Sequence, residues 1–147
     1  MPILTLLTAD GKRVHEAAGL NWGFSKVAHV CKNDAYIPLH IKTIRKNYAF
    51  FNARNRTNNT PLVFEWDDGV TMTGLFEGTI PDNATGLVYP KQISSHPQKD
   101  TLGIYIRKRI GVPLNTMVTL ADLQNYGRTD VEITHLGGNK YRLDFHI

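Results

Sequence analysis

Two segments in which apolar and polar residues alternate constrain the fold of this chain more than any other feature. In the first, residues 62–76, the alternation continues on both sides of Asp67-Asp68-Gly69. In the second, residues 131–147, it continues on both sides of Gly137-Gly138-Asn139. Alternating side chains point to opposite faces of a strand, and turn sequences of this kind join antiparallel neighbours. Both segments therefore predict hairpins that present one face to a core.

Shorter apolar segments predict the remaining elements. Extended pieces are expected at residues 3–8, 14–18, 35–38 and 102–106, the last because apolar residues occupy every second position. A helix is expected at residues 41–51, where apolar residues recur at helical spacing, and a second one between Thr119 and Gly127. About seven irregularly spaced strands and two short helices favour a mainly β (α+β) fold, a small antiparallel barrel.

Residues 90–112 combine a polar stretch with one of these expected strands. The polar half contains no apolar run to bury, and the expected strand would give it a rigid base. Its side chains are of the types that contact base edges and phosphates in a DNA groove. The candidates are Lys91, Gln92, Ser94, Ser95, His96, Gln98 and Lys99. An ordinary polar loop before an ordinary strand is the alternative.

A second candidate segment, residues 19–26, has neither helical nor strand periodicity. It places aromatic residues among Gly, Asn, Ser and Lys, which suits a projecting loop that inserts side chains into a partner. Asn21, Ser25 and Lys26 are the recognition candidates. Trp22 and Phe24 could instead close the end of a barrel.

The charged residues are unevenly distributed along the chain. Residues 12–56 carry nine Lys/Arg and two carboxylates, net +7, and residues 91–109 have a net charge of +4. Residues 57–90 between them carry five carboxylates and no Lys/Arg, net −5. A fold that brings the two basic segments to one face would present a positive surface to a polyanion such as DNA.

Several classes of protein are disfavoured. One cysteine, Cys31, forms no internal disulfide, and no Cys/His pair has zinc spacing, so neither a structural metal nor a cofactor is expected. Asp67 and Asp68 could bind a metal, but acidic tight turns are far commoner. No signal peptide or membrane span is recognisable, so a cytoplasmic protein without membrane contact is expected. The length of 147 residues fits one domain, residues 1–147.

Catalysis has little support in the sequence. No histidine accompanies a Ser or Cys in a nucleophile turn, and no Gly-rich phosphate loop is present. One partial match exists, because His40, Lys42 and Asn47 resemble the His-x-Lys-x4-Asp motif of phospholipase D-type nucleases, with Asn in place of the carboxylate. On the expected helix these three side chains fall on different faces, which disfavours a shared pocket.

The combined motifs resemble the specificity domain of NgoFVII-type restriction endonucleases. That domain is similar to those of EcoRII and BfiI and to the plant transcription-factor pseudobarrel called B-three. The resemblance runs from about residue 15 to the C-terminus. The segments that carry it are Gly19-Leu20-Asn21-Trp22-Gly23, Asn33-Asp34-Ala35-Tyr36-Ile37-Pro38, Phe50-Phe51, Asp67-Asp68-Gly69, Leu102-Gly103-Ile104-Tyr105-Ile106-Arg107-Lys108-Arg109-Ile110-Gly111-Val112, Asp122-Leu123-x-x-Tyr126-Gly127-Arg128-Thr129-Asp130-Val131 and Tyr141-x-Leu143-Asp144-Phe145.

This resemblance implies a seven-stranded pseudobarrel with two short helices that grips double-stranded DNA in the major groove with two arms. The arms would be residues 20–34 and residues 91–101, which lie in the two basic segments. In the family this domain recognises the target sequence and does not cut, so a nuclease catalytic domain is expected in the same chain or complex. Family members commonly carry the domain at the C-terminus of a longer chain, whereas this sequence begins with it.

Roles for individual residues follow from side-chain chemistry on such arms. Trp22 would brace the early arm, and Asp34 would accept from a cytosine amino group. The expected base readers are Asn21, Asn33, Gln92 and His96; the expected contacts to guanine or phosphate are Lys26, Lys91, Lys99 and Arg107; the expected positioning hydroxyls are Ser25, Ser94 and Ser95. Two alternatives remain: a nuclease that uses His40 and Lys42, and a protein-interaction barrel that binds an acidic partner.

Overall fold

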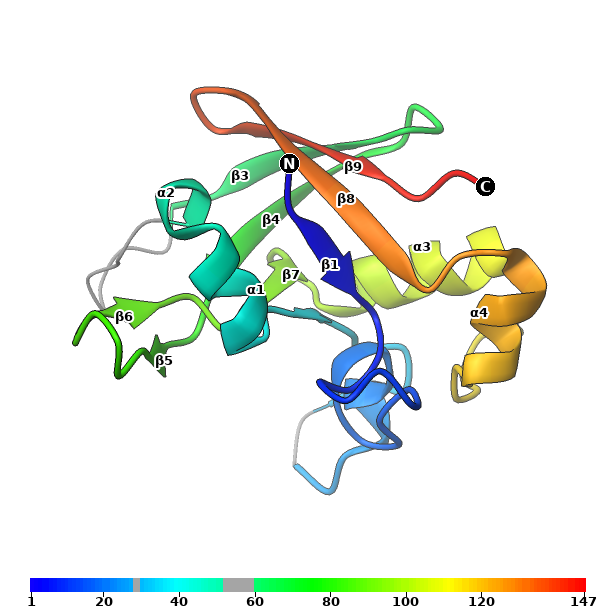
Figure 1. Cartoon of the computed structure of the whole chain (residues 1–147). Coiled ribbons are helices and arrows are strands. Elements are labelled where there is room, and N and C mark those ends of the chain that lie inside the picture. Colours follow the sequence, from blue (N-terminus) through cyan, green and yellow to red (C-terminus); the bar gives the residue numbers. More distant parts are fainter. Residues whose placement is uncertain (28–29, 52–59) are drawn as a thin grey trace.

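A curved, nearly closed sheet dominates the computed structural model, which describes residues 1–27, 30–51 and 60–147 (Figure 1). Within these residues seven strands form the sheet, in the order β1-β8-β9-β3-β4-β7-β2. They are β1 (Ile3–Thr5), β2 (Ile37–Pro38), β3 (Leu62–Trp66), β4 (Thr71–Glu77), β7 (Gln92–Ser95), β8 (Asp130–Gly137) and β9 (Lys140–Asp144). Neighbouring strands are antiparallel except β3 and β9, which are parallel. The edge strands β1 and β2 contact each other, which confirms the expected mainly β pseudobarrel.

The two hairpins expected from the alternating residues are present. β3 pairs with β4, with Phe64 opposite Met72, and β8 pairs with β9, with Ile133 opposite Leu143. The inward residues of these strands are buried in one core together with Trp66 and Phe145. The alternation therefore predicted both the pairing and the buried face.

The expected strand at residues 102–106 is wrong, because this segment belongs to the helix α3 (Asp100–Ile110). Its buried residues, Leu102, Gly103, Ile106 and Arg107, recur at helical spacing. Asp100 lies in the first turn and three cations lie in the last turn, an arrangement that favours a helix dipole. Gly111 ends the helix with a φ of 78°, a left-handed conformation typical of helix ends.

The two expected helices are found with altered bounds. The first is divided into α1 (Ile41–Lys46) and α2 (Tyr48–Phe51), because Asn47 leaves helical geometry at φ −142°. The second is α4 (Leu120–Tyr126), which Thr119 begins with a reciprocal capping box with Asp122. α4 packs beside α3. In Figure 1 α3 passes behind the lower end of β8 towards α4 at the right, whereas α1 and α2 lie to the left of β8.

Two further segments differ from the sequence expectation. Residues 14–18 form no strand, and the polar residues Gln92 to Ser95 form the buried strand β7 between β4 and β2. The connection from β4 to β7 projects as a small hairpin of β5 (Ile80–Pro81) and β6 (Val88–Tyr89), which the sequence did not indicate. This hairpin supplies one wall of the cleft described next.

Candidate DNA interface

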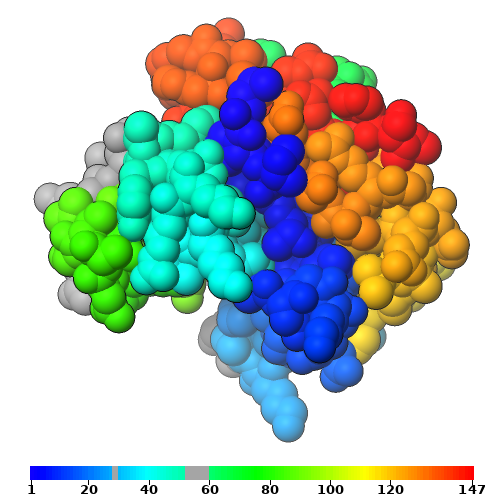
Figure 2. Space-filling view, in the orientation of Figure 1, coloured from blue at the N-terminus to red at the C-terminus, as the bar shows by residue number. Residues whose placement is uncertain are grey.

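A cleft opens between two projecting segments that are distant in the sequence. One, here called the early segment, comprises residues 19–27 and 30–34 and begins with the 3-10 helix η1 (Gly19–Phe24). The other is the β5–β6 hairpin. Figure 2 shows the surface hollowed between the hairpin, green at the left, and the early segment, blue at the bottom. Two pockets of about 310 and 410 Å³ lie here and share Tyr36, Lys91 and Gln92 in their linings.

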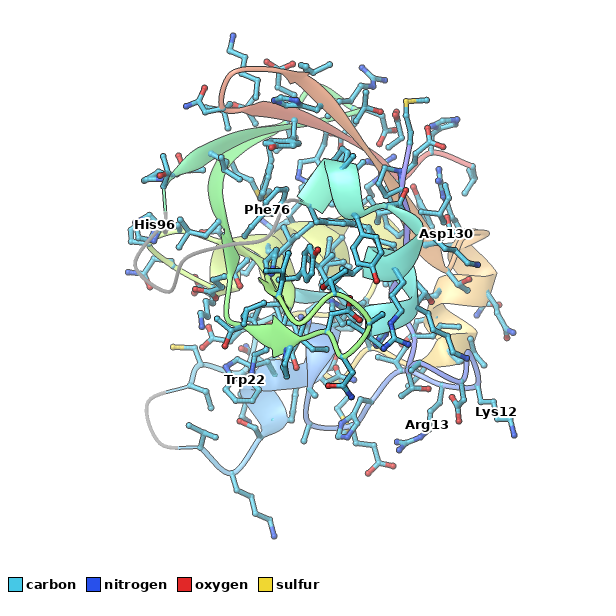
Figure 3. The ribbon with its side chains drawn as sticks, turned by 60° about the vertical axis from the view of Figure 1, so that its left-hand side comes forward. Lys12, Arg13, Trp22, Phe76, His96 and Asp130 are labelled. Atoms are coloured by element: carbon cyan, nitrogen blue, oxygen red, sulfur yellow. The ribbon has the colours of Figure 1, made fainter. Side chains whose placement is uncertain are left out.

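The smaller pocket, here called the Glu77 pocket, gathers side chains from separate parts of the chain. Trp22 and Tyr36 form an aromatic wall, with their rings edge to face and their centroids 5.9 Å apart. Figure 3 shows Trp22 projecting from η1. The full lining is Trp22, Tyr36, Glu77, Gly78, Lys91, Gln92 and Lys99. The pocket thus combines ring faces, cations and one carboxylate, a set suited to polar, planar ligands such as base edges.

Glu77, at the end of β4, is the centre of a hydrogen-bond network in this pocket. Its Oε1 accepts from Gln92 Nε2 at 2.9 Å and from Ser94 Oγ at 2.6 Å, and it lies 3.2 Å from Lys99 Nζ. Burial raises the pKa of the Glu77 carboxyl, but hydrogen bonds from these three donors outweigh it and bring the pKa below its ordinary value of 4.5. Glu77 is therefore an ionised acceptor at neutral pH.

Lys91 lies across the tight turn that follows β4. Gly78 there has a φ of +71°, and a Cβ on it would lie 2.6 Å from Lys91 Cγ. Glycine at this position thus satisfies the backbone geometry and leaves room for the lysine stem. Lys91 remains exposed and lines both pockets, so its ammonium is available to an anion in the cleft.

α3 packs against the base of the early segment. A Cβ on Gly103 would lie 1.6 Å from the Asn33 carbonyl oxygen, so only glycine allows this close approach. One turn later, the buried Arg107 donates to the carbonyls of Leu20, Gly103 and Thr116. The base of the early segment is therefore fixed by the helix.

The hairpin is fastened to α1 and α2 through Asp82. Asp82 is 1% exposed and accepts from Tyr48 Oη at 2.7 Å and from Arg45 Nε at 2.9 Å. It also accepts from the backbone N–H and the hydroxyl of Thr85 within the hairpin. The hydrogen bond from Tyr48 and those from Arg45 and Thr85 hold the Asp82 pKa far below its ordinary value. Both walls of the cleft are thus anchored to the body of the protein.

Comparison with known families identifies the class of protein that carries this cleft. The model of the NgoFVII C-terminal B3-like DNA-binding domain matches residues 3–137. The chain belongs to this family. No curated protein matches it. The resemblance seen in the sequence motifs is confirmed, and this NgoFVII-type B3-like domain is a DNA-binding domain.

Four of the candidate residues meet in the Glu77 pocket of this B3-like domain. Trp22 comes from the early segment, whereas Lys91, Gln92 and Lys99 flank or begin β7. Gln92 is mostly buried and donates to Glu77 and Ser94, and Lys99 keeps 39% of its side chain exposed. The structure therefore joins candidates from both basic segments, although the two lysines of the pocket both come from the later one.

Other candidates belong to the framework beneath the cleft. Arg107 and Asn21 are buried, so neither side chain reaches the surface. The Asn21 side-chain amide donates to the carbonyls of His15 and Val118 and accepts from the Val118 backbone N–H. Ser95 is buried and accepts from Leu102 N at the start of α3. Ser94 is buried against Glu77, and Asp34, 9% exposed, accepts from the Cys31 amide. The expected base and phosphate contacts of these residues are corrected accordingly, because their polar atoms are already paired inside the protein.

The remaining candidates lie outside the Glu77 pocket. Lys26 is exposed on the early segment, and Ser25 beside it is half-buried. Asn33 pairs with Asn115. Its Nδ2 donates to Asn115 Oδ1 at 3.1 Å, and its Oδ1 accepts from the Asn115 backbone N–H at 2.7 Å. His96 is exposed on the turn after β7 and is well separated from Trp22 in Figure 3. Arg54 and Arg56, part of the early basic stretch, lie outside the described residues.

The expected late arm at residues 91–101 does not project. Its centre is the buried strand β7, and its end begins α3, because these residues pair with β4 and β2. The projecting element that faces the early segment is the β5–β6 hairpin instead (Figure 1).

The nuclease alternative finds little support in the geometry. His40 precedes α1, and its Nε2 lies 3.0 Å from the Leu7 carbonyl, so this nitrogen carries a hydrogen and is not a free nucleophile. The Asn47 amide donates to the Thr43 carbonyl. In the described part of the chain, no group of three His, Cys, Asp or Glu residues is placed to hold a metal ion. No helix there has the length and apolar character to cross a membrane.

Sequence reasoning missed Glu77, Tyr36 and the hairpin. Glu77 lies at the end of β4, a strand with an apolar face, and Tyr36 immediately precedes β2. The sequence pattern around both residues therefore indicates strands and gives no sign of a binding site. Weak sequence signals for the hairpin were two glycines: Gly78 precedes β5, Gly86 lies in the turn between β5 and β6, and both have positive φ.

Proposed function

We propose that this B3-like domain binds double-stranded DNA sequence-specifically in the cleft, with the early segment and the β5–β6 hairpin as arms in the major groove. The observation that supports this most is the meeting of Trp22, Lys91, Gln92 and Lys99 in one pocket. The adjoining pocket shares Lys91 and Gln92 with it and is lined by Ile80 of the hairpin. Residues 1–147 would form one recognition domain without catalytic activity. A nuclease domain in the same chain or complex would supply cleavage.

The exposed cations carry distinct roles in this proposal. Lys91 and Lys99 donate to guanine or to phosphates at the cleft floor, and Lys26 contacts DNA from the early segment. Trp22 braces that segment against Tyr36. Ser25, Asn33 and His96 remain candidate contacts at the edges of the interface, while the buried Gln92 acts on Glu77.

The decisive experiment is the selection of bound duplexes from a random pool. The selected duplex is then compared with a scrambled duplex at two salt concentrations. We expect one short motif and a specific complex that survives salt which removes the scrambled duplex. Equal, steeply salt-dependent binding to all sequences would contradict sequence recognition and would favour a basic barrel with an acidic partner.

Substitution of Lys91 tests the position of the interface. Lys91→Ala should weaken binding of the selected duplex by roughly 1 to 3 kcal/mol, because an exposed cation of the cleft is lost. The matched control is Lys140→Ala in β9, which begins at the end of the molecule opposite the cleft (Figure 1). Fluorescence anisotropy with labelled duplex measures both. Equal losses in the two variants would place the DNA elsewhere.

A further inference from the structure

Glu77 is an unusual side chain for the floor of a cleft that receives DNA. Its carboxylate is ionised and 17% exposed, and it faces the same pocket as Lys91 and Lys99. Phosphates repel a carboxylate, so an acidic side chain here favours a contact with bases over a contact with the backbone.

The two carboxylate oxygens of Glu77 have different environments. Oε1 accepts from Gln92 and Ser94 and is paired with Lys99, whereas no donor among the described residues contacts Oε2. Lys99 is 39% exposed and pairs with Oε1, so its ammonium has further N–H groups to donate beside the Glu77 carboxylate. The pocket therefore offers an acceptor, Glu77 Oε2, close to a donor, the Lys99 ammonium. Gln92 and Ser94 of β7 hold the Glu77 carboxylate in place.

A G·C base pair offers the complementary pattern in the major groove. Cytosine presents the N4 amino donor, and guanine beside it presents the O6 and N7 acceptors. An A·T pair also presents an amino donor, adenine N6, but its two acceptors, adenine N7 and thymine O4, lie on opposite sides of that amino group. Guanine O6 and N7 lie together on one side of the cytosine amino group, so only the G·C pair gives the Lys99 ammonium two adjacent acceptors beside a donor for Glu77.

We propose that Glu77 and Lys99 together read one G·C base pair, with Glu77 Oε2 accepting from cytosine N4 and Lys99 donating to guanine O6 and N7. This assignment rests on the proposed binding of DNA in the cleft. It gives Glu77 the cytosine contact that the sequence suggested for Asp34. Gln92 and Ser94 are then positioning residues, because they hold the Glu77 carboxylate and do not touch the base.

The test compares the base preferences of wild-type protein and Glu77→Gln, each selected from the same random pool. Gln keeps an oxygen that accepts from Gln92 and Ser94, but it replaces the free acceptor with an amide donor. Wild type should prefer G·C at one position by roughly 5- to 150-fold, and Glu77→Gln should lose this preference at that position alone. Lys99→Gln should relax the same position. Glu132→Gln in β8, outside the pocket lining, is the matched control and should leave every position unchanged.

A second measurement uses wild-type protein and altered duplexes, so it does not depend on the folding of variants. At the identified position, cytosine is replaced by a pyrimidinone that lacks the amino group, or guanine by 7-deazaguanine. Each change should weaken binding several-fold, whereas the same changes at a flanking G·C pair outside the motif should not.

The outcomes separate this inference from the proposed function. If wild type enriches no motif, DNA recognition in the cleft fails. If it enriches a motif but Glu77→Gln weakens all positions equally, or the affected position is A·T, the reading of a G·C pair is overturned while DNA recognition stands.

Discussion

At the scale of single residues, Arg107 shows how a charged side chain can support an interface without contacting its ligand. Its guanidinium is fully buried and donates to the carbonyls of Leu20, Gly103 and Thr116, which come from three separate segments. Burial lowers the pKa of Arg107, but an arginine stays protonated, so the cation is compensated by main-chain dipoles. Arg107 therefore ties the early segment to α3.

Arg107→Met should lower the free energy of unfolding by about 2 to 4 kcal/mol, because three buried carbonyls lose their donor. Lys108→Met, at the exposed neighbouring position, should change it by less than about 0.5 kcal/mol. Urea unfolding followed by circular dichroism measures both variants. An unchanged midpoint for Arg107→Met would mean that water or repacking satisfies those carbonyls.

At the scale of elements, the β5–β6 hairpin is a short, two-stranded ribbon that could not be stable alone. Asp82 fastens it to α1 and α2 through Arg45 and Tyr48, and also closes the hairpin turn through Thr85. A preorganised arm loses less conformational entropy on binding, which favours affinity. The hairpin and the helices therefore act as one unit.

Asp82→Asn should loosen this hairpin while the barrel stays folded. The variant loses the charge that pairs with Arg45, and its amide group meets donors where Asp82 has only acceptors. Amide hydrogen exchange should become faster in the hairpin and stay unchanged in β8 and β9. Asn83→Ala, at the exposed next position, is the control. Uniform acceleration across the chain would instead indicate global destabilisation.

At the scale of the whole molecule, several carboxylates are stabilised in their ionised form by neighbours from distant elements. Burial raises the pKa of Asp67, but hydrogen bonds from Arg109 and the Phe145 amide outweigh it and lower the pKa. The Glu77 and Asp82 pKa values are also lowered. Each of these contacts joins one strand or hairpin to another part of the fold.

Stability should therefore fall in acid. Groups with a lowered folded-state pKa stabilise the protein above their unfolded values, 3.8 for Asp and 4.5 for Glu, and lose this effect as pH falls. The free energy of unfolding should be nearly constant between pH 7 and 5.5 and should decrease below about pH 4.5. Urea titrations at each pH measure it, and Asp67→Asn should flatten the decrease. A free energy that rises in acid would contradict this account.

The sequence by itself determined the two main hairpins, the helix at Thr119 and the family, because alternation, capping residues and motif spacing are local properties. It also indicated Trp22, Lys91, Gln92 and Lys99, because their chemistry suits DNA. Only the tertiary structure separated these from Arg107 and Asn21, since burial depends on which segments pack together. It likewise decided that residues 102–106 are helical, because their apolar residues alternate as in a strand, whereas the residues that become buried recur at helical spacing. Glu77 became a candidate only when β4, β7 and the early segment met around one pocket.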